Sequence, residues 1–253
     1  MRGLTKSFGS RAVLEGASFR ISAGEVVALV GPSGSGKSTL LSLLTGALEP
    51  DHGQILFDGR PITARDDGRA VPARDRPFAY MPQRDVLLPW RRVIDNAAIG
   101  LEVAGVGRPE ARRRVAALLA DFGLAGTERH YPRQLSGGMR QRVSFLRTVV
   151  QERGVLLLDE PFGALDAITR DELQQWLLGI WETHGWSILL VTHDIREALR
   201  LADRVLVLPA TAGPPLGEVA VSRTISRGAG FLLDPRVPPL EEELHTLLTR
   251  ARG

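Results

Sequence analysis

The segment from residue 25 to residue 45 constrains the fold of this 253-residue chain more than any other part of the sequence. A short β-branched and apolar run, Glu25 to Val30, is followed directly by a glycine-rich stretch, Gly31 to Thr39. From Lys37 to Thr45 the apolar residues have helical spacing, which ends near Gly46. We therefore predict a strand, a glycine loop and a helix in succession.

The glycine loop fits the pattern G-x-x-x-x-G-K-[ST], which is typical of loops that bind nucleotide phosphates. Its glycines let backbone N–H groups turn toward phosphate oxygens at a helix N-terminus. Lys37 would offer its charge to the β- and γ-phosphates and Ser38 its hydroxyl to Mg²⁺. A dinucleotide loop is excluded, because Thr39 stands where G-x-G-x-x-G requires its last glycine. The candidate phosphate-binding residues are Gly31, Pro32, Ser33, Gly34, Ser35, Gly36, Lys37, Ser38 and Thr39.

Composition limits the remaining possibilities. With 43% hydrophobic and 24% charged residues, the chain is expected to be globular with a sizeable core. Its longest apolar runs are too short to cross a bilayer, and the first six residues lack the apolar core of a secretory signal, so we expect a cytoplasmic protein. Zero cysteines exclude disulfides, thiolate metal sites and cysteine nucleophiles. The net charge of +3 is too small to indicate a nucleic-acid partner, and we expect none.

Hydrophobic patterns along the chain predict an α/β fold with a RecA-like P-loop NTPase core. Residues 12–21 and 54–57 favour an N-terminal antiparallel β subdomain, and residues 93–150 have the spacing of an inserted α-helical subdomain. Apolar strands expected at 78–81, 155–158, 187–191 and 204–208 alternate with helices, which indicates a doubly wound parallel sheet. Residues 60–77 lack a hydrophobic period and are expected to form an exposed loop. We predict a nucleotide-binding domain at 1–208, with the helical subdomain at about 84–150, and a short tail with a terminal helix at 209–253.

Two adjacent carboxylates, Asp159 and Glu160, follow the predicted strand at 155–158. Ligands of parallel sheets bind at the carboxyl ends of the strands, and successive residues there point to different sides. Asp159 could therefore reach a Mg²⁺ ion while Glu160 polarises the attacking water. The alternative for this pair is capping of the next helix.

Gln83 and His193 also stand just after predicted strands. A glutamine after proline is commonly a turn residue, and a single histidine is commonly structural. Their shared position at strand ends makes both residues candidates for sensing the γ-phosphate or for holding the attacking water.

The segment Leu135 to Arg142 supplies a second potential anion site. Ser136, Gly137 and Gly138 open a helix there, which presents N–H groups, a hydroxyl and the positive end of the helix dipole. A second such terminus is useful if it serves the nucleotide of another copy of the chain. A plain helix cap is the alternative.

In order along the chain, these segments resemble every motif of the ATP-binding subunit of ABC transporters, from about Leu4 to Leu208. Gly31 to Thr39 resembles the Walker A loop, Leu135 to Gln141 the signature, and Val155 to Glu160 the Walker B strand with its catalytic glutamate. Gln83 resembles the Q-loop glutamine, Asp166 lies in a segment similar to the D-loop, and His193 resembles the switch histidine. Phe8 matches the aromatic residue that stacks on adenine, with a hydrophobic anchor of the N-terminal sheet as the alternative.

The resemblance implies an ATPase that uses ATP and Mg²⁺. It implies three catalytic residues, Glu160, His193 and Gln83, and three metal ligands, Ser38, Gln83 and Asp159. It also implies further nucleotide contacts from Ser136, Gly137, Gly138, Gln141 and Asp166. Two copies would close head to tail around two ATP molecules, with Ser136 of one copy on the γ-phosphate held by the other. Closure of this dimer would drive two transmembrane permease subunits. The resemblance places the ATP-binding subunit at the cytoplasmic face of the inner membrane as a peripheral protein. It also implies an extracytoplasmic solute-binding protein as an indirect partner.

The stretch from Leu87 to Asn96 is similar to importers of the nitrate, sulfonate and taurine group, which includes carriers of pyrimidine precursors. The resemblance therefore implies import of a small anionic or heterocyclic nutrient, although this chain does not itself read the solute. Two other functions stay open at this point. One is a small-molecule P-loop kinase, which has no use for Leu135 to Arg142. The other is a nucleic-acid-associated ATPase of the same superfamily, which usually carries coiled-coil or tandem domains.

Overall fold

The computed structural model describes residues 1–62, 71–72, 75–228 and 230–252. The chain divides into two compact units, and each is described by itself. The first consists of Met1–Phe78 and Gly185–Gly253, and the second of Ala79–His184. Among the described residues, no helix combines the length and apolarity that a bilayer span requires.

The first unit contains a mixed sheet in the order β11-β10-β3-β9. The strands β3 (Val26–Val30), β9 (Ser187–Val191) and β10 (Arg204–Val207) are parallel, while β11 (Gly217–Ala220) pairs with β10 in the antiparallel direction. Every residue of β3 is buried. This explains why its sequence is apolar throughout instead of alternating, as is usual for a strand covered on both faces. The predicted parallel sheet is confirmed.

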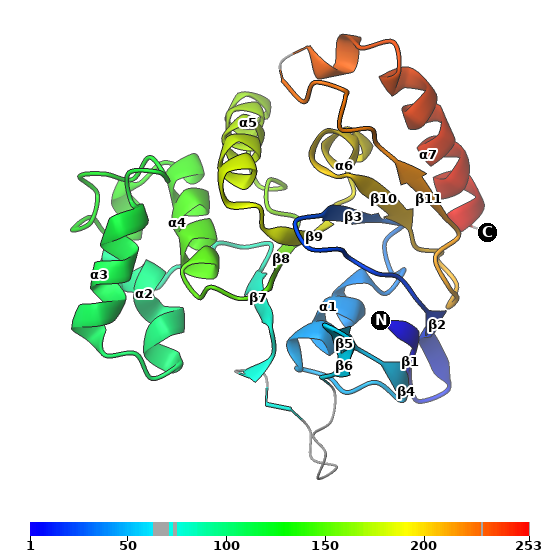
Figure 1. Ribbon diagram of the computed structural model, residues 1–253, viewed down its shortest axis with the longest axis horizontal. Helices are drawn as coiled ribbons and strands as arrows, with labels where there is room; N and C mark the ends of the chain where they lie inside the picture. The colour runs from blue at the N-terminus through cyan, green and yellow to red at the C-terminus, as the bar shows by residue number, and fades with distance from the viewer. Residues whose placement is uncertain (63–70, 73–74, 229, 253) are drawn as a thin grey trace. The chain divides into compact units, whose positions relative to one another are not determined.

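Helices cover both faces of this sheet (Figure 1). The helix α1 (Lys37–Thr45) lies on one side, and α6 (Ile195–Leu201) and α7 (Val237–Ala251) lie on the other. α6 packs on β3 and β10, and α7 packs on β10, β11 and the 3₁₀ helix η3 (Phe231–Leu233).

Antiparallel strands occupy the N-terminal part of the first unit. β1 (Arg2–Phe8) pairs on one side with β2 (Arg11–Ala17) and on the other with β4 (His52–Gln54). A short hairpin joins β5 (Leu56–Phe57) to β6 (Arg60–Pro61). The helix α1 contacts β2, so this antiparallel sheet borders the glycine loop that precedes α1.

The expectation of an exposed loop at 60–77 falls partly on residues 63–70 and 73–74, which lie outside the described residues. For Arg76 that expectation is wrong, because its side chain is fully buried. Its guanidinium donates to the carbonyl oxygen of Leu43 at 2.6 Å and to a carboxylate oxygen of Glu49 at 2.7 Å. Paired in this way, a charged group can be buried at the C-terminal end of α1.

The second unit is mainly helical, with the neighbouring strands β7 (Phe78–Met81) and β8 (Val155–Asp159). α2 packs on α3 and α4, and α4 packs on α5. A ring cluster of Phe122, Phe145 and Trp176, with centroids 5.3–5.9 Å apart, joins α4 to α5. The helices of this unit are α2 (Val93–Val103), α3 (Arg108–Leu118), η2 (Pro132–Gln134), α4 (Gly137–Val149) and α5 (Ala167–His184).

Candidate functional site

In the first unit, the glycine loop wraps around the ammonium group of Lys37. This side chain starts at the first residue of α1 and folds back over the loop. Its Nζ donates to the carbonyl oxygens of Gly31 at 2.8 Å and Pro32 at 2.9 Å, and lies 3.3 Å from Oγ of Ser35. The first N–H groups of a helix have no partners inside that helix, so loop and helix together offer donors and a positive charge to an anion.

Two glycines of the loop are required by its geometry. Gly36 is the N-cap of α1 and has a φ of +90°, and a Cβ there would lie 2.9 Å from Cδ2 of Leu14. At Gly31 a Cβ would lie 2.7 Å from the carbonyl oxygen of Leu208. The side chain of Leu14 and the backbone of Leu208 therefore leave no room for a side chain at either position.

The other two candidates of the first unit lie on its surface. Phe8 ends β1, the residue is 50% exposed, and Nζ of Lys6 lies 5.8 Å from the centroid of its ring. His193 follows β9 and is also exposed, and the next residue, Asp194, caps α6 by accepting from two backbone N–H groups. A half-exposed aromatic residue suits stacking on a planar base. The roles of both residues remain predictions.

In the second unit, the two carboxylates after β8 have different hydrogen-bond partners. Oε2 of Glu160 accepts from Nε2 of Gln83 at 2.7 Å, so the structure brings these two candidates together. Oδ2 of Asp159 accepts from the hydroxyl of Tyr80 at 3.0 Å. Burial, followed by the negative charge of Asp159, raises the pKa of Tyr80. The sequence reasoning missed Tyr80, although its alternation with the buried Ala79 and Met81 places it on the exposed face of β7.

Glu160 has an unusual backbone conformation. Its φ of +43° lies in the left-handed region, which costs a non-glycine residue about 1–2 kcal/mol. The N–H of Gly163 donates to the carbonyl oxygen of Glu160 at 3.1 Å and closes a tight turn through Pro161 and Phe162. The surrounding structure must therefore hold this turn in place.

The signature segment forms the N-terminus of α4. Ser136 is exposed and caps the helix, since its Oγ accepts from the N–H of Met139 at 3.2 Å. A Cβ at Gly138 would lie 3.0 Å from Cγ2 of Thr169, which explains a glycine at that position. Asp166 accepts from the N–H of Thr169 at 3.0 Å, and this backbone hydrogen bond lowers the pKa of its carboxyl group.

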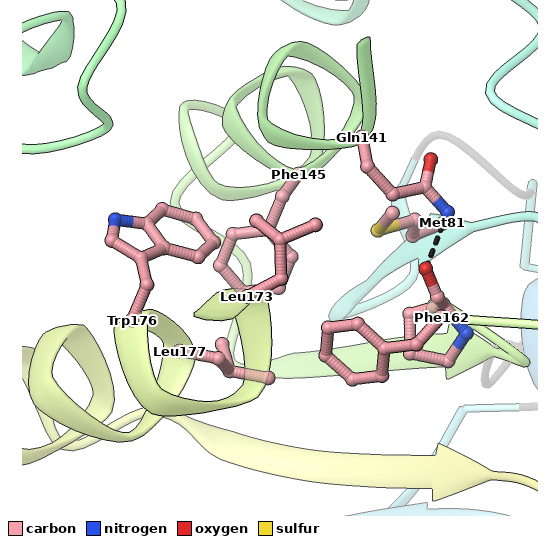
Figure 2. Close-up of a pocket in the computed structure, with 8 residues that line it drawn as sticks. Met81, Gln141, Phe145, Phe162, Leu173, Trp176 and Leu177 are labelled. Atoms are coloured by element: carbon pink, nitrogen blue, oxygen red, sulfur yellow. Dashed lines mark hydrogen bonds between the residues drawn. The ribbon is translucent and has the colours of Figure 1, made fainter. Parts of the chain in front are cut away.

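Gln141, which the resemblance assigns to the nucleotide, points into the interior of the second unit in this structure. Only 7% of it is exposed, and its amide donates to the carbonyl oxygen of Pro161. Figure 2 shows this bond at the edge of a small pocket. The pocket is lined by Met81, Gln141, Phe145, Pro161, Phe162, Leu173, Trp176 and Leu177.

The ligands predicted for Mg²⁺ are the hydroxyl of Ser38, the side-chain amide of Gln83 and the carboxylate of Asp159. Oxygen ligands of this kind fit a hard cation, which usually takes few protein ligands and completes its shell with water and substrate phosphates. Within the described part of the chain, no cluster of three or more His, Cys, Asp or Glu residues could hold a metal by itself. By their chemistry alone, these ligand types suit a Mg²⁺ ion that arrives with a nucleotide, and their assignment to the metal remains a prediction.

Comparison with known proteins identifies related sequences. The family model described as ABC transporter matches residues 14–163. The aliphatic sulfonates import ATP-binding protein SsuB 2 of Pseudomonas aeruginosa is 41% identical over 266 residues, which cover 100% of this chain and 91% of that protein. The taurine import ATP-binding protein TauB of Yersinia pestis is 43% identical over 90% of this chain and 85% of its own length.

Solved structures give the same result for the fold. The dimeric structure of the ABC transporter cassette MJ0796 matches with a TM-score of 0.72 and 29% identity, over 87% of this chain and 97% of that one. A second structure of that cassette, a post-hydrolysis state bound to ADP and Pi, matches equally well. The predicted α/β fold of the P-loop NTPase type is thereby confirmed.

Proposed function

We propose, from the premise that this chain belongs to the ABC transporter family, that it couples ATP hydrolysis to the import of sulfonates such as taurine. It is an ABC ATPase of the importer type, as the sequence predicted. The observation that carries the choice of solute is the 41–46% identity to sulfonate and taurine import subunits over most of the chain. Family membership removes the small-molecule kinase as a candidate, and no observation favours the nucleic-acid-associated ATPase.

In the proposed reaction, the loop from Gly31 to Thr39 binds the triphosphate and Phe8 stacks on the adenine. Lys37 is well suited to its role, because its ammonium group already lies inside a ring of loop oxygens and could exchange them for phosphate oxygens. His193 senses the γ-phosphate. Mg²⁺, when bound with the nucleotide by Ser38, Asp159 and Gln83, supplies charge neutralisation for the phosphoryl group.

Glu160 accepts the proton of the attacking water in this proposal. Its carboxylate is oriented by the 2.7 Å hydrogen bond from Gln83, whose position in turn depends on the segment that follows β7. Orientation of a general base in this way contributes to rate, because proton transfer needs the base within hydrogen-bond reach of the water.

A second copy of the chain completes each nucleotide site in the proposed assembly. Ser136, Gly137 and Gly138 of one copy contact the γ-phosphate held by the other, and Asp166 lies at the same junction. Two features of the signature helix support this: its serine is exposed, and its first turn is held by the serine cap. Hydrolysis would remove the group that bridges the copies, so the dimer would open and move two permease subunits. The chain would act at the cytoplasmic face of the inner membrane, with a solute-binding protein outside.

Dimer formation tests the nucleotide chemistry. Glu160→Gln should keep ATP binding, because its amide oxygen can still accept from Gln83, while turnover falls by about 10²–10⁴-fold for loss of a general base. Gel filtration of this variant with ATP and Mg²⁺ is expected to give a dimer. Adding Ser136→Arg should leave an ATP-bound monomer, whereas Ser226→Arg, at another exposed serine, should leave the dimer. Turnover of Glu160→Gln within tenfold of the parent would contradict the assignment.

Growth assays test the solute. A strain without this subunit is expected to lose growth on taurine or alkanesulfonates as the sole sulfur source and to keep growth on sulfate. Unchanged growth on sulfonates together with lost growth on nitrate as the nitrogen source would instead assign the nitrate branch of the same group.

A further inference from the structure

Gln141 links the signature helix to the turn that carries Glu160. It lies near the beginning of α4, four residues after Gly137, and its amide donates to the carbonyl oxygen of Pro161. Pro161 directly follows Glu160 in the sequence, so the bond is one residue from the glutamate.

The surroundings make this bond costly to lose. Apart from Gln141, the side chains that line the pocket are apolar or aromatic, and both Gln141 and Pro161 are buried. A carbonyl oxygen in such a place needs a donor, because water that could replace the donor is absent from apolar surroundings. Without the amide, the Pro161 peptide would have to rotate toward another donor.

Rotation of that peptide would displace Glu160. The glutamate has a φ of +43°, a conformation that must be enforced by its neighbours, and its carbonyl oxygen is already bonded to the N–H of Gly163. On the side-chain end, Gln83 holds the carboxylate. Glu160 is therefore held at two points, by Gln83 through its side chain and by Gln141 through the backbone that follows it.

We propose that Gln141 is a positioning residue for Glu160 and not a direct nucleotide contact. The proposal rests on the proposed function, in which Glu160 is the general base. It has a consequence for a dimer: the helix whose cap, Ser136, serves the partner's nucleotide also holds the base that serves its own nucleotide. Contact of Ser136 with the partner's nucleotide would therefore affect the position of Glu160 at the chain's own nucleotide.

The test substitutes Gln141 by Met, which keeps the apolar contacts and approximate volume but removes the donor. We expect the kcat of the Mg²⁺-dependent ATPase to fall about tenfold or more, since small displacements of a catalytic group have effects of this size. The KM for ATP should stay within about twofold. The matched control is Thr148→Val on the same helix, which removes a buried hydrogen bond to the carbonyl oxygen of Ser144 and leaves the Glu160 turn alone. Its kcat should equal that of the parent.

A second comparison separates positioning from general packing. In a Glu160→Gln background, Gln141→Met should lower kcat by less than about twofold, because the residue it positions is already disabled. If the Met variant does not fold, Gln141→Leu gives the same comparison, because its smaller apolar side chain also cannot donate to Pro161.

Three results would overturn the inference. They are an unchanged kcat in Gln141→Met, a raised KM with unchanged kcat, and a full tenfold loss on top of Glu160→Gln. A raised KM would return Gln141 to the nucleotide. Failure of the proposed function looks different, because the unmodified chain would then lack Mg²⁺-dependent ATPase activity, and the inference would fall with it.

Discussion

Replacing Arg76 by Met should lower the free energy of unfolding of the first unit by about 2–5 kcal/mol. The guanidinium is fully buried at the C-terminal end of α1, the helix that starts at the phosphate loop. It donates to the carbonyl oxygens of Leu43 at 2.6 Å and Leu44 at 3.4 Å, to that of Val71 at 3.3 Å, and to Glu49 at 2.7 Å. Methionine would occupy much of the space but would donate to none of these oxygens.

The loss can be divided among these contacts. The short bond to Leu43 comes from a charged donor, which is worth about 1.5–3 kcal/mol. The partner Glu49 is 47% exposed, so water screens this ion pair and it adds about 0.2–1 kcal/mol. The two long bonds contribute little, and a cation at a helix C-terminus adds about 0.3–1 kcal/mol. Together they predict that the free energy of unfolding falls by about 2–5 kcal/mol.

Urea denaturation followed by circular dichroism measures this quantity. Arg113→Met is the matched control: its side chain is 78% exposed and pairs only at the surface with Glu110, so its effect should stay below about 0.5 kcal/mol. The ATP affinity of folded Arg76→Met should remain close to that of the parent, because the change lies at the far end of α1 from the loop. A loss of less than about 1 kcal/mol would refute the assignment of Arg76 as the buried cap of this helix.

Two further predictions follow from the same structure. Gly36→Ala combines a left-handed φ of +90° with a Cβ 2.9 Å from Leu14, so it should destabilise the chain by about 2–5 kcal/mol and reduce ATP binding in a fluorescent-nucleotide titration. Near-parent binding would show that the loop tolerates a side chain. Hydrogen bonds from Arg112, and then from Arg108, outweigh burial and lower the pKa of Asp95. The contribution of ionised Asp95 to the free energy of unfolding is thus fully present above its unfolded pKa of about 3.9. It is lost as the pH falls through the lower pKa of the folded state. The stability difference between the parent and Asp95→Asn should shrink between pH 5 and pH 2, and a constant difference in urea midpoints would contradict this.

The sequence alone was sufficient wherever the pattern is local. The strand, loop and helix around Gly31 to Thr39 were predicted with the observed helix bounds, Lys37–Thr45. They follow from glycine placement, apolar spacing and a helix stop at Gly46, all of which act over a few residues. The order of the segments along the chain was also sufficient to indicate the family, which the comparisons confirmed. The roles of the individual site residues stay predictions.

Tertiary structure decided which polar groups are satisfied by distant neighbours. No local pattern shows that Arg76 lies buried under α1, that Tyr80 donates to Asp159, or that Gln141 turns inward to Pro161. Gln141 and Pro161 are 20 residues apart in the sequence, Arg76 and Leu43 are 33 apart, and Tyr80 and Asp159 are 79 apart. Such partners meet only when strands and helices have packed. The physical reason is that a turn or helix depends on nearby torsions and spacing, whereas a buried donor depends on which acceptor the completed packing places beside it.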